Sequence, residues 1–302
     1  MPAGIDPAGN GSNAGVVPAE PRDARIIRIG GFDTLIMEKG QGRPVVLFHG
    51  SSIAVDGWLT WFRSFDMLAQ SHRVICYDQP CFGRSEVPAD RCYLDRLERS
   101  QHAQALIEAL DLRDAILIGH SEGGFIATKL ALDNPDRVSK LIIVTSGGTS
   151  PVLGGDADQA WQEASAEVYD YPRRSVSEEI FVRSEGHLRH RADPPFEQRL
   201  RENFRLACQS GNRDCFLNLA RGRSGYGNYA AIQEHHILPF LPGLSIETLL
   251  VWGGADETVP VARGLKLAAL IPRSEMHVFP HAGHWVMHEA HEGFNRLLAG
   301  WI

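Results

Sequence analysis

The sequence of 302 residues lacks an excess of positive charge, a disulfide framework and a long apolar segment. It has 30 Lys and Arg against 37 Asp and Glu, and this net charge of −7 argues against binding to nucleic acid or to an anionic membrane surface. The five cysteines form no C-x-x-C pair and their odd number leaves at least one unpaired, which favours a reducing compartment. No apolar run approaches the roughly 18 residues that cross a bilayer. We therefore expect a soluble, cytoplasmic protein.

Residues 1–24 combine Gly, Pro, Ala and Asn and lack the apolar region of a signal peptide. We interpret them as a flexible N-terminal arm. The whole chain has 43% hydrophobic and 22% charged residues, which is ordinary for a globular protein and excludes a collagen-like, coiled-coil or disordered chain.

Short runs rich in Val and Ile alternate with stretches of helical periodicity, such as the apolar stripe of Trp58, Trp61, Phe62 and Phe65. The strand-like runs are 25–29, 34–37, 45–48, 74–77, 115–118, 141–145, 249–252 and 276–279. This alternation predicts an α/β fold with a mostly parallel, eight-stranded sheet covered by helices on both faces. A last helix is expected over 285–298.

The alternation stops between 150 and 244. In this stretch we find only amphipathic segments at 160–169, 176–189 and 196–209. The pattern predicts a helical cap (150–244) inserted after the sixth strand of a core formed by 25–149 and 245–302.

The sharpest motif is Gly119-His120-Ser121-Glu122-Gly123-Gly124, which follows a strand and opens a helix. A G-x-S-x-G sequence in this context predicts a tight turn that lifts the serine hydroxyl above the sheet. We therefore predict Ser121 as a nucleophile. The helix that starts there provides free N–H groups for a developing oxyanion.

A serine nucleophile needs a base and an acid, which in this type of fold follow in the order Ser, Asp or Glu, His. Asp256 follows the strand at 249–252 and is the predicted acid, with Glu257 as the competing carboxylate. His284 follows the last strand and is the predicted base.

A metal site is the alternative for the C-terminal histidines, because His281, His284, His288 and His291 are spaced by three, four and three residues. However, the H-E-x-x-H pattern is absent. We expect His288 and His291 on a solvated helix face, and we expect the protein to need neither a metal nor another cofactor.

The oxyanion hole needs a second N–H from the loop after the third strand. We assign it to Ser51, together with the amide of Glu122. The Glu122 side chain is expected to point into solvent at the helix entry, with a general-acid role as the alternative.

These motifs resemble the α/β-hydrolase superfamily over Ile26 to Ile302. Within it, the chain looks most like the meta-cleavage product hydrolases, which split carbon–carbon bonds in vinylogous 1,5-diketones. The strings that carry the resemblance are His49-Gly50, Asp78–Ser85, the Ser121 turn, Asp256 with Pro260, Gly264–Leu267, Met276–Phe279, Gly283-His284-Trp285 and Phe294–Leu297.

The resemblance implies a pocket-lining role for Trp285 and a cap arginine that holds the substrate carboxylate, for which Arg183 is the best match. Ser52 and His120 stand where this chain departs from the usual family pattern, as do Glu122 and Cys81. Ser52 and His120 are therefore further candidates for substrate contact.

We expect a cofactor-independent serine hydrolase that cleaves a C–C bond next to a carbonyl of a small-molecule substrate. The alternative is a carboxylesterase or lactonase with the same triad, since both reactions pass through a tetrahedral intermediate and fold analogy cannot separate them. The position of His120 beside the nucleophile also leaves lyase or cofactor-free oxygenase chemistry open. A non-catalytic receptor and assembly into a homo-oligomer are further alternatives.

Overall fold

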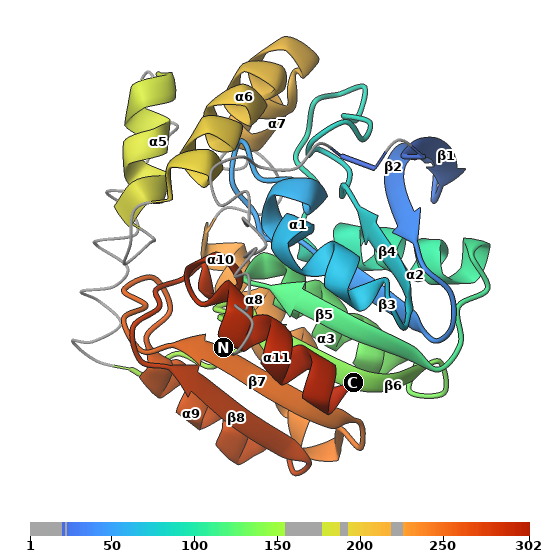
Figure 1. Cartoon of the computed structure of the whole chain (residues 1–302), viewed down its shortest axis with the longest axis vertical. Helices are drawn as coiled ribbons and strands as arrows, with labels where there is room; N and C mark the ends of the chain where they lie inside the picture. Colours follow the sequence, from blue (N-terminus) through green and yellow to red (C-terminus); the bar gives the residue numbers. More distant parts are fainter. Residues whose placement is uncertain (1–19, 22, 155–176, 188–192, 219–225) are drawn as a thin grey trace, which may run out of the picture.

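The computed structural model describes residues 20–21, 23–154, 177–187, 193–218 and 226–302 (Figure 1). The predicted helical segment 160–169 lies outside these residues, as do 188–189 and most of the N-terminal arm. Within the described part of the chain, no helix has the length and apolar character needed to cross a membrane.

The eight strands form one sheet in the order β1-β2-β4-β3-β5-β6-β7-β8. The β1–β2 and β2–β4 pairs are antiparallel, and all other neighbouring strands are parallel. The strands are β1 (Arg25–Ile29), β2 (Phe32–Lys39), β3 (Pro44–Phe48), β4 (Arg73–Tyr77), β5 (Ala115–His120), β6 (Val138–Val144), β7 (Glu247–Gly253) and β8 (Ser274–Phe279). The predicted mostly parallel, eight-stranded α/β sheet is thus confirmed.

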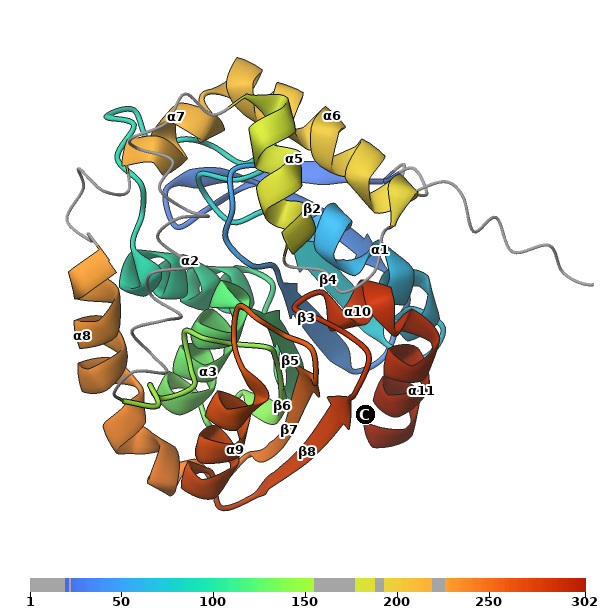
Figure 2. The same cartoon turned by 90° about the vertical axis from the view of Figure 1, so that its left-hand side faces the viewer.

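Helices cover both faces of the sheet (Figures 1 and 2). In β3, Val45 and Leu47 belong to one apolar core and Val46 and Phe48 to the other, because successive side chains of a strand point to opposite faces. The first core packs against α1 (Gly57–Leu68) and α11 (His291–Trp301), and the second against α2 (Arg96–Ala109), α3 (Glu122–Asp133) and α9 (Val261–Leu270).

The expected single helix over 285–298 is divided in two. α10 (Val286–Glu289) is followed by Ala290, whose φ of −124° is not helical, and α11 starts at His291. The Glu289 carboxylate accepts a hydrogen bond from the Gly283 N–H at 3.0 Å, which ties α10 to the preceding loop. The change of direction lets α10 bury Val286 and α11 bury Phe294.

The chain between β6 and β7 forms α5 (Glu178–His187), α6 (Pro194–Ser210), α7 (Asn212–Leu217), α8 (Tyr226–His236) and the 3₁₀-helix η3 (Leu238–Gly243). The described residues of this stretch contain no strand, as the sequence predicts. In Figure 2, α5, α6 and α7 gather at one end of the molecule, whereas α8 lies near α2. The division into a core and a cap stays a prediction.

Candidate active site

Loops at the carboxyl ends of four parallel strands bring most of the predicted residues together, as is typical of open α/β sheets. Ser121 directly follows β5, and the loops after β3, β7 and β8 carry Ser51, Asp256 and His284. A small open cavity lies between these loops and α5. The described residues that line it are Gly50, Ser51, Ser52, Val55, His120, Ser121, Glu185, His284 and Trp285.

Ser121 has the strained backbone expected of a tight strand-to-helix turn. Its φ of 53° and ψ of −118° lie in a region that residues with a side chain rarely adopt. A Cβ at Gly119 would lie 2.3 Å from the Gly123 carbonyl oxygen, and a Cβ at Gly123 would lie 2.4 Å from the Phe48 carbonyl oxygen. The turn therefore requires glycine at both flanking positions.

His284 and Asp256 form a buried hydrogen-bonded pair. The His284 Nδ1–H donates to Asp256 Oδ2 at 3.0 Å, which leaves Nε2 as the ring nitrogen that can accept a proton. The other Asp256 oxygen accepts the N–H groups of Thr258 and Val259, each at 2.8 Å. Glu257 is exposed, so the structure brings Asp256 and not Glu257 to the histidine.

The other C-terminal histidines do not gather around His284. His281 is exposed and His291 is half-buried, whereas His288 is buried against Phe62 and Phe196 with ring centroids 5.1 and 4.8 Å away. The expectation of a solvated His288 is therefore wrong, because α10 turns this side chain inward. Among the described residues, no group of three or more His, Cys, Asp and Glu side chains has a geometry that could hold a metal ion.

His120 directly precedes the serine, and its imidazole ring is buried and neutral. Its Nε2–H donates to the carbonyl oxygen of His284 at 3.0 Å. Burial, together with the neighbouring His284, lowers the pKa of His120 well below its usual value. Its Nδ1 is therefore a bare lone pair, and it has no hydrogen-bond partner among the described residues.

The two serines of the β3 loop are held by two side chains that no sequence motif indicates, Tyr93 and Glu185. The Ser51 hydroxyl lies 2.6 Å from the Tyr93 hydroxyl. The Ser52 hydroxyl donates to Oε1 of Glu185, which lies on α5. One available signal for Glu185 is its position on the buried side of α5 with Phe181 and Val182, where a carboxylate is unusual.

Arg183, the expected anchor for a substrate carboxylate, is exposed and is not among the residues that line the cavity. It lies two residues before Glu185, which corresponds to about 200° around an α-helix. Since Glu185 faces the cavity, Arg183 faces the opposite way.

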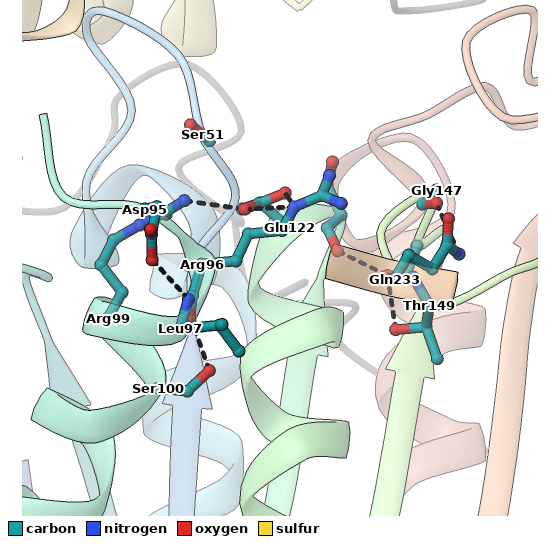
Figure 3. A network of polar contacts seen from close by, with 12 residues as sticks. Ser51, Asp95, Arg96, Leu97, Arg99, Ser100, Glu122, Gly147, Thr149 and Gln233 are labelled. Carbon is teal, nitrogen blue, oxygen red and sulfur yellow. Dashed lines mark hydrogen bonds and ion pairs between the residues drawn. The ribbon is translucent and has the colours of Figure 1, made fainter. Parts of the chain in front are cut away.

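The side chain of Glu122 is buried instead of pointing into solvent, which corrects the expectation for this residue (Figure 3). Both of its oxygens accept from Arg96 Nε at 2.8 Å, and Oε1 also accepts from Arg99 Nη2 at 2.7 Å. Burial opposes the charged form, but the two arginines outweigh it and hold the pKa of Glu122 below its usual value. Its side chain does not line the cavity, while its backbone N–H is the first of α3 and therefore has no partner within the helix.

The comparisons with known proteins agree with this architecture. Residues 43–291 match the model of a family described as the alpha/beta hydrolase fold. The 2-hydroxymuconate semialdehyde hydrolase of Pseudomonas sp. strain CF600 is 32% identical, over 93% of this chain and 94% of that protein. The enzyme of the same name from Pseudomonas putida is 30% identical, over 93% of this chain and 95% of that protein.

Solved structures show the same fold. A meta-cleavage product hydrolase from Pseudomonas fluorescens IP01 is 24% identical with a TM-score of 0.77, over 91% of this chain and 96% of that chain. Est816, described as an N-acyl homoserine lactone degrading enzyme, is 26% identical with a TM-score of 0.69, over 92% of this chain and all of that chain. The sheet order, the turn at Ser121 and these matches lead to one conclusion: the chain belongs to the alpha/beta hydrolase fold family and is related to the meta-cleavage product hydrolases.

Proposed function

We propose that the protein is a cofactor-independent serine hydrolase that cleaves a C–C bond next to a carbonyl in a dienone-type substrate. The observation that carries the proposal is the shared cavity of Ser121 and His284, in which the tautomer of His284 is set by Asp256. The identity of about 30% to 2-hydroxymuconate semialdehyde hydrolases over nearly the whole chain supports a dienone as the substrate class.

In the proposed reaction, His284 Nε2 takes the proton of the Ser121 hydroxyl or of a water molecule, and the oxygen attacks the carbonyl carbon. Asp256 stabilises the imidazolium that forms, and the amides of Ser51 and Glu122 stabilise the oxyanion. When the tetrahedral intermediate collapses, the electron pair of the C–C bond passes into the conjugated remainder of the substrate, which then takes up a proton. Where Ser121 is the attacking group, water hydrolyses the resulting acyl-enzyme.

Helices α5 to α7 act in this proposal as a cap over the site. The contribution of Glu185 from α5 to the cavity wall supports this role.

The experiment compares the turnover of ring-fission dienones with that of aryl esters and lactones. We expect C–C cleavage of the dienones by the wild type, and for Ser121→Ala a kcat lower by roughly 10³-fold or more with the fold retained. Near-wild-type turnover by the variant, or fluorophosphonate labelling of another serine, would contradict the assignment of Ser121.

Ester or lactone hydrolysis by the same triad is the second candidate. It is favoured by the cavity wall, where the described lining residues include Glu185 but neither Arg nor Lys to hold a dienone carboxylate. The likeness to Est816 is consistent with it. Efficient turnover of neutral esters or lactones without any turnover of acidic dienones would select this candidate.

A further inference from the structure

Tyr93 is a buried tyrosine that contacts the active-site loop after β3. Its hydroxyl lies 2.6 Å from the hydroxyl of Ser51, which lines the cavity that contains Ser121. Only 3% of Tyr93 is exposed, and burial raises the pKa of its hydroxyl above the usual value, so the hydroxyl keeps its hydrogen at neutral pH. Tyr93 is not among the residues that line the cavity. It can therefore act on a bound substrate only through Ser51.

The ring of Tyr93 is held by three neighbouring side chains. Phe82 and Phe216 meet it edge to face, with ring centroids 5.8 and 5.5 Å away. The guanidinium of Arg99 lies over the ring, 5.1 Å from its centroid. Aromatic and cation–π contacts of this kind favour one orientation of the ring. The position of the Tyr93 hydroxyl is therefore fixed independently of Ser51.

Arg99 also contacts the residues around both proposed oxyanion donors. It is fully buried, and its Nη2 donates to Glu122 Oε1 at 2.7 Å, at the first residue of α3 (Figure 3). Its Nη1 donates to Gln79 Oε1 at 3.2 Å. The Gln79 Nε2 in turn donates to the carbonyl oxygen of His49 at 2.7 Å, two residues before Ser51. One guanidinium thus joins the loop after β3 to the start of α3.

These two backbone segments lie directly against each other at the nucleophile. A Cβ at Gly50 would lie 3.3 Å from the Ser121 Cβ, and a Cβ at Gly123 would lie 2.6 Å from the His49 carbonyl oxygen. Donors of an oxyanion hole must lie about 2.7 to 3.1 Å from the oxyanion. A small displacement of Ser51 would therefore weaken the stabilisation of the oxyanion.

We propose that Tyr93 is a positioning residue of the oxyanion hole, which holds the N–H of Ser51 in place through the contact between the two hydroxyls. Arg99 connects this contact to Glu122, whose N–H is the second donor. The effect belongs to the transition state, because the carbonyl oxygen of the substrate becomes fully charged only after the attack. The inference rests on the proposed roles of Ser121 and of the two amides.

The test measures the hydrolysis of p-nitrophenyl acetate, with the active sites counted by fluorophosphonate titration. Tyr93→Phe removes the hydroxyl and keeps the ring between its neighbours. We expect kcat per titrated site to fall by at least ~10-fold. KM should stay within about threefold of the wild-type value, because acylation and deacylation both pass through an oxyanion and are slowed together.

Tyr77→Phe is the matched control. It also removes the hydroxyl of a buried tyrosine, but this hydroxyl has no hydrogen-bond partner among the described residues. Its kcat and KM should stay within about twofold of the wild-type values. Urea unfolding of both variants shows whether either substitution changes the stability of the fold.

Ser51→Ala interrupts the same contact from the other side and keeps the backbone N–H. If Tyr93 acts through Ser51, the two single variants should lose kcat by similar factors, and the double variant should be no slower than the slower single variant. The inhibition constant of phenylboronic acid should rise as kcat falls, because its tetrahedral adduct with Ser121 places an oxygen in the oxyanion hole. If Tyr93→Phe does not fold, the same changes are expected for Ser51→Ala alone.

The inference is wrong if a folded Tyr93→Phe variant or Ser51→Ala keeps the wild-type kcat. It is also wrong if Tyr93→Phe slows the Ser51→Ala variant as much as it slows the wild type. Failure of the proposed nucleophile gives a different result: Ser121→Ala then hydrolyses the ester as the wild type does, or the wild type does not hydrolyse it, and the inference falls with it. Absence of dienone cleavage alone contradicts only the C–C proposal.

Discussion

At the scale of single residues, the site depends on atoms that have very little freedom. Ser121 has a positive φ, and the glycines around it approach backbone oxygens more closely than a side chain permits. Both carboxylate oxygens of Asp256 accept hydrogen bonds. One accepts from His284, and the other accepts from two backbone N–H groups of its own loop. Substitutions at these positions therefore have defined consequences.

Asp256→Asn should lower kcat by about 10² to 10⁴-fold, because an amide at this position no longer selects the His284 tautomer with a free Nε2. Glu257→Gln is the control, since the Glu257 side chain is exposed. Steady-state kinetics with the best substrate from the screen measures both variants. A larger loss for Glu257→Gln than for Asp256→Asn would transfer the role to Glu257.

Gly123→Ala should destabilise the protein by about 1 to 3 kcal/mol or prevent folding, because the added methyl would meet the Phe48 carbonyl oxygen at 2.4 Å. Gly300→Ala is the control, since a Cβ there meets nothing within 4 Å and alanine is the better helix former. Urea unfolding should show a loss of free energy for the first variant and a small gain for the second. Equal stability of the two would refute the steric argument.

At the scale of elements, α2 and α3 are joined by a buried charge cluster next to the nucleophile (Figure 3). Glu122 of α3 pairs with Arg96 and Arg99 of α2, and Arg99 also donates to Gln79 Oε1 at 3.2 Å. Since Glu122 is the first residue of α3, this cluster fixes the end of the helix at which its N–H is proposed to stabilise the oxyanion.

Glu122→Ala should lower the free energy of unfolding by about 3 to 5 kcal/mol, because it leaves the Arg99 guanidinium buried without its carboxylate. Glu108→Ala removes an exposed carboxylate from α2 and should change stability far less. Urea denaturation followed by circular dichroism gives both values. Similar losses in the two variants would argue against a structural role for the charge cluster.

At the scale of the whole molecule, buried histidines make stability depend on pH. Burial lowers the pKa of His49 to about 3 and that of His102 to about 4, from about 6.5 in an unfolded chain. Below pH 6.5 the unfolded chain therefore binds protons that the folded protein does not. As a result, the free energy of unfolding decreases as the pH is lowered. Asp78 acts in the opposite direction, because burial and the nearby Asp56 raise its pKa to about 7.

His102→Gln should isolate one of these contributions, since the other groups are common to both proteins. Between pH 6.5 and pH 5, the wild type should lose about 1.5 kcal/mol more of its unfolding free energy than the variant does. His277→Gln replaces an exposed histidine and should keep the wild-type pH dependence. Urea unfolding at several pH values measures the three proteins, and identical curves for the wild type and His102→Gln would contradict the argument.

The sheet and the local geometry of the turn at Ser121 could be predicted from the amino-acid pattern alone. Apolar runs such as 45–48 must be buried on both faces, and all eight predicted runs became strands. The glycines around Ser121 permit a turn that few other residues allow, so its position was predictable from six neighbouring residues. Loops that follow parallel strands then share one edge of the sheet, which brought Asp256, His284 and Ser121 to one region.

Which helical side chains face the cavity depends on packing between elements that are distant in the sequence. The rotation of α5, which turns Glu185 inward and Arg183 outward, comes from packing against α6. The Ser52–Glu185 contact joins residues 133 positions apart, and the Glu122–Arg99 pair joins residues 23 positions apart. The burial of His288 likewise depends on Phe62 and Phe196, from distant parts of the chain. Local periodicity shows which side of a helix is apolar, but the environment of a polar residue on that side is set by elements far away in the sequence.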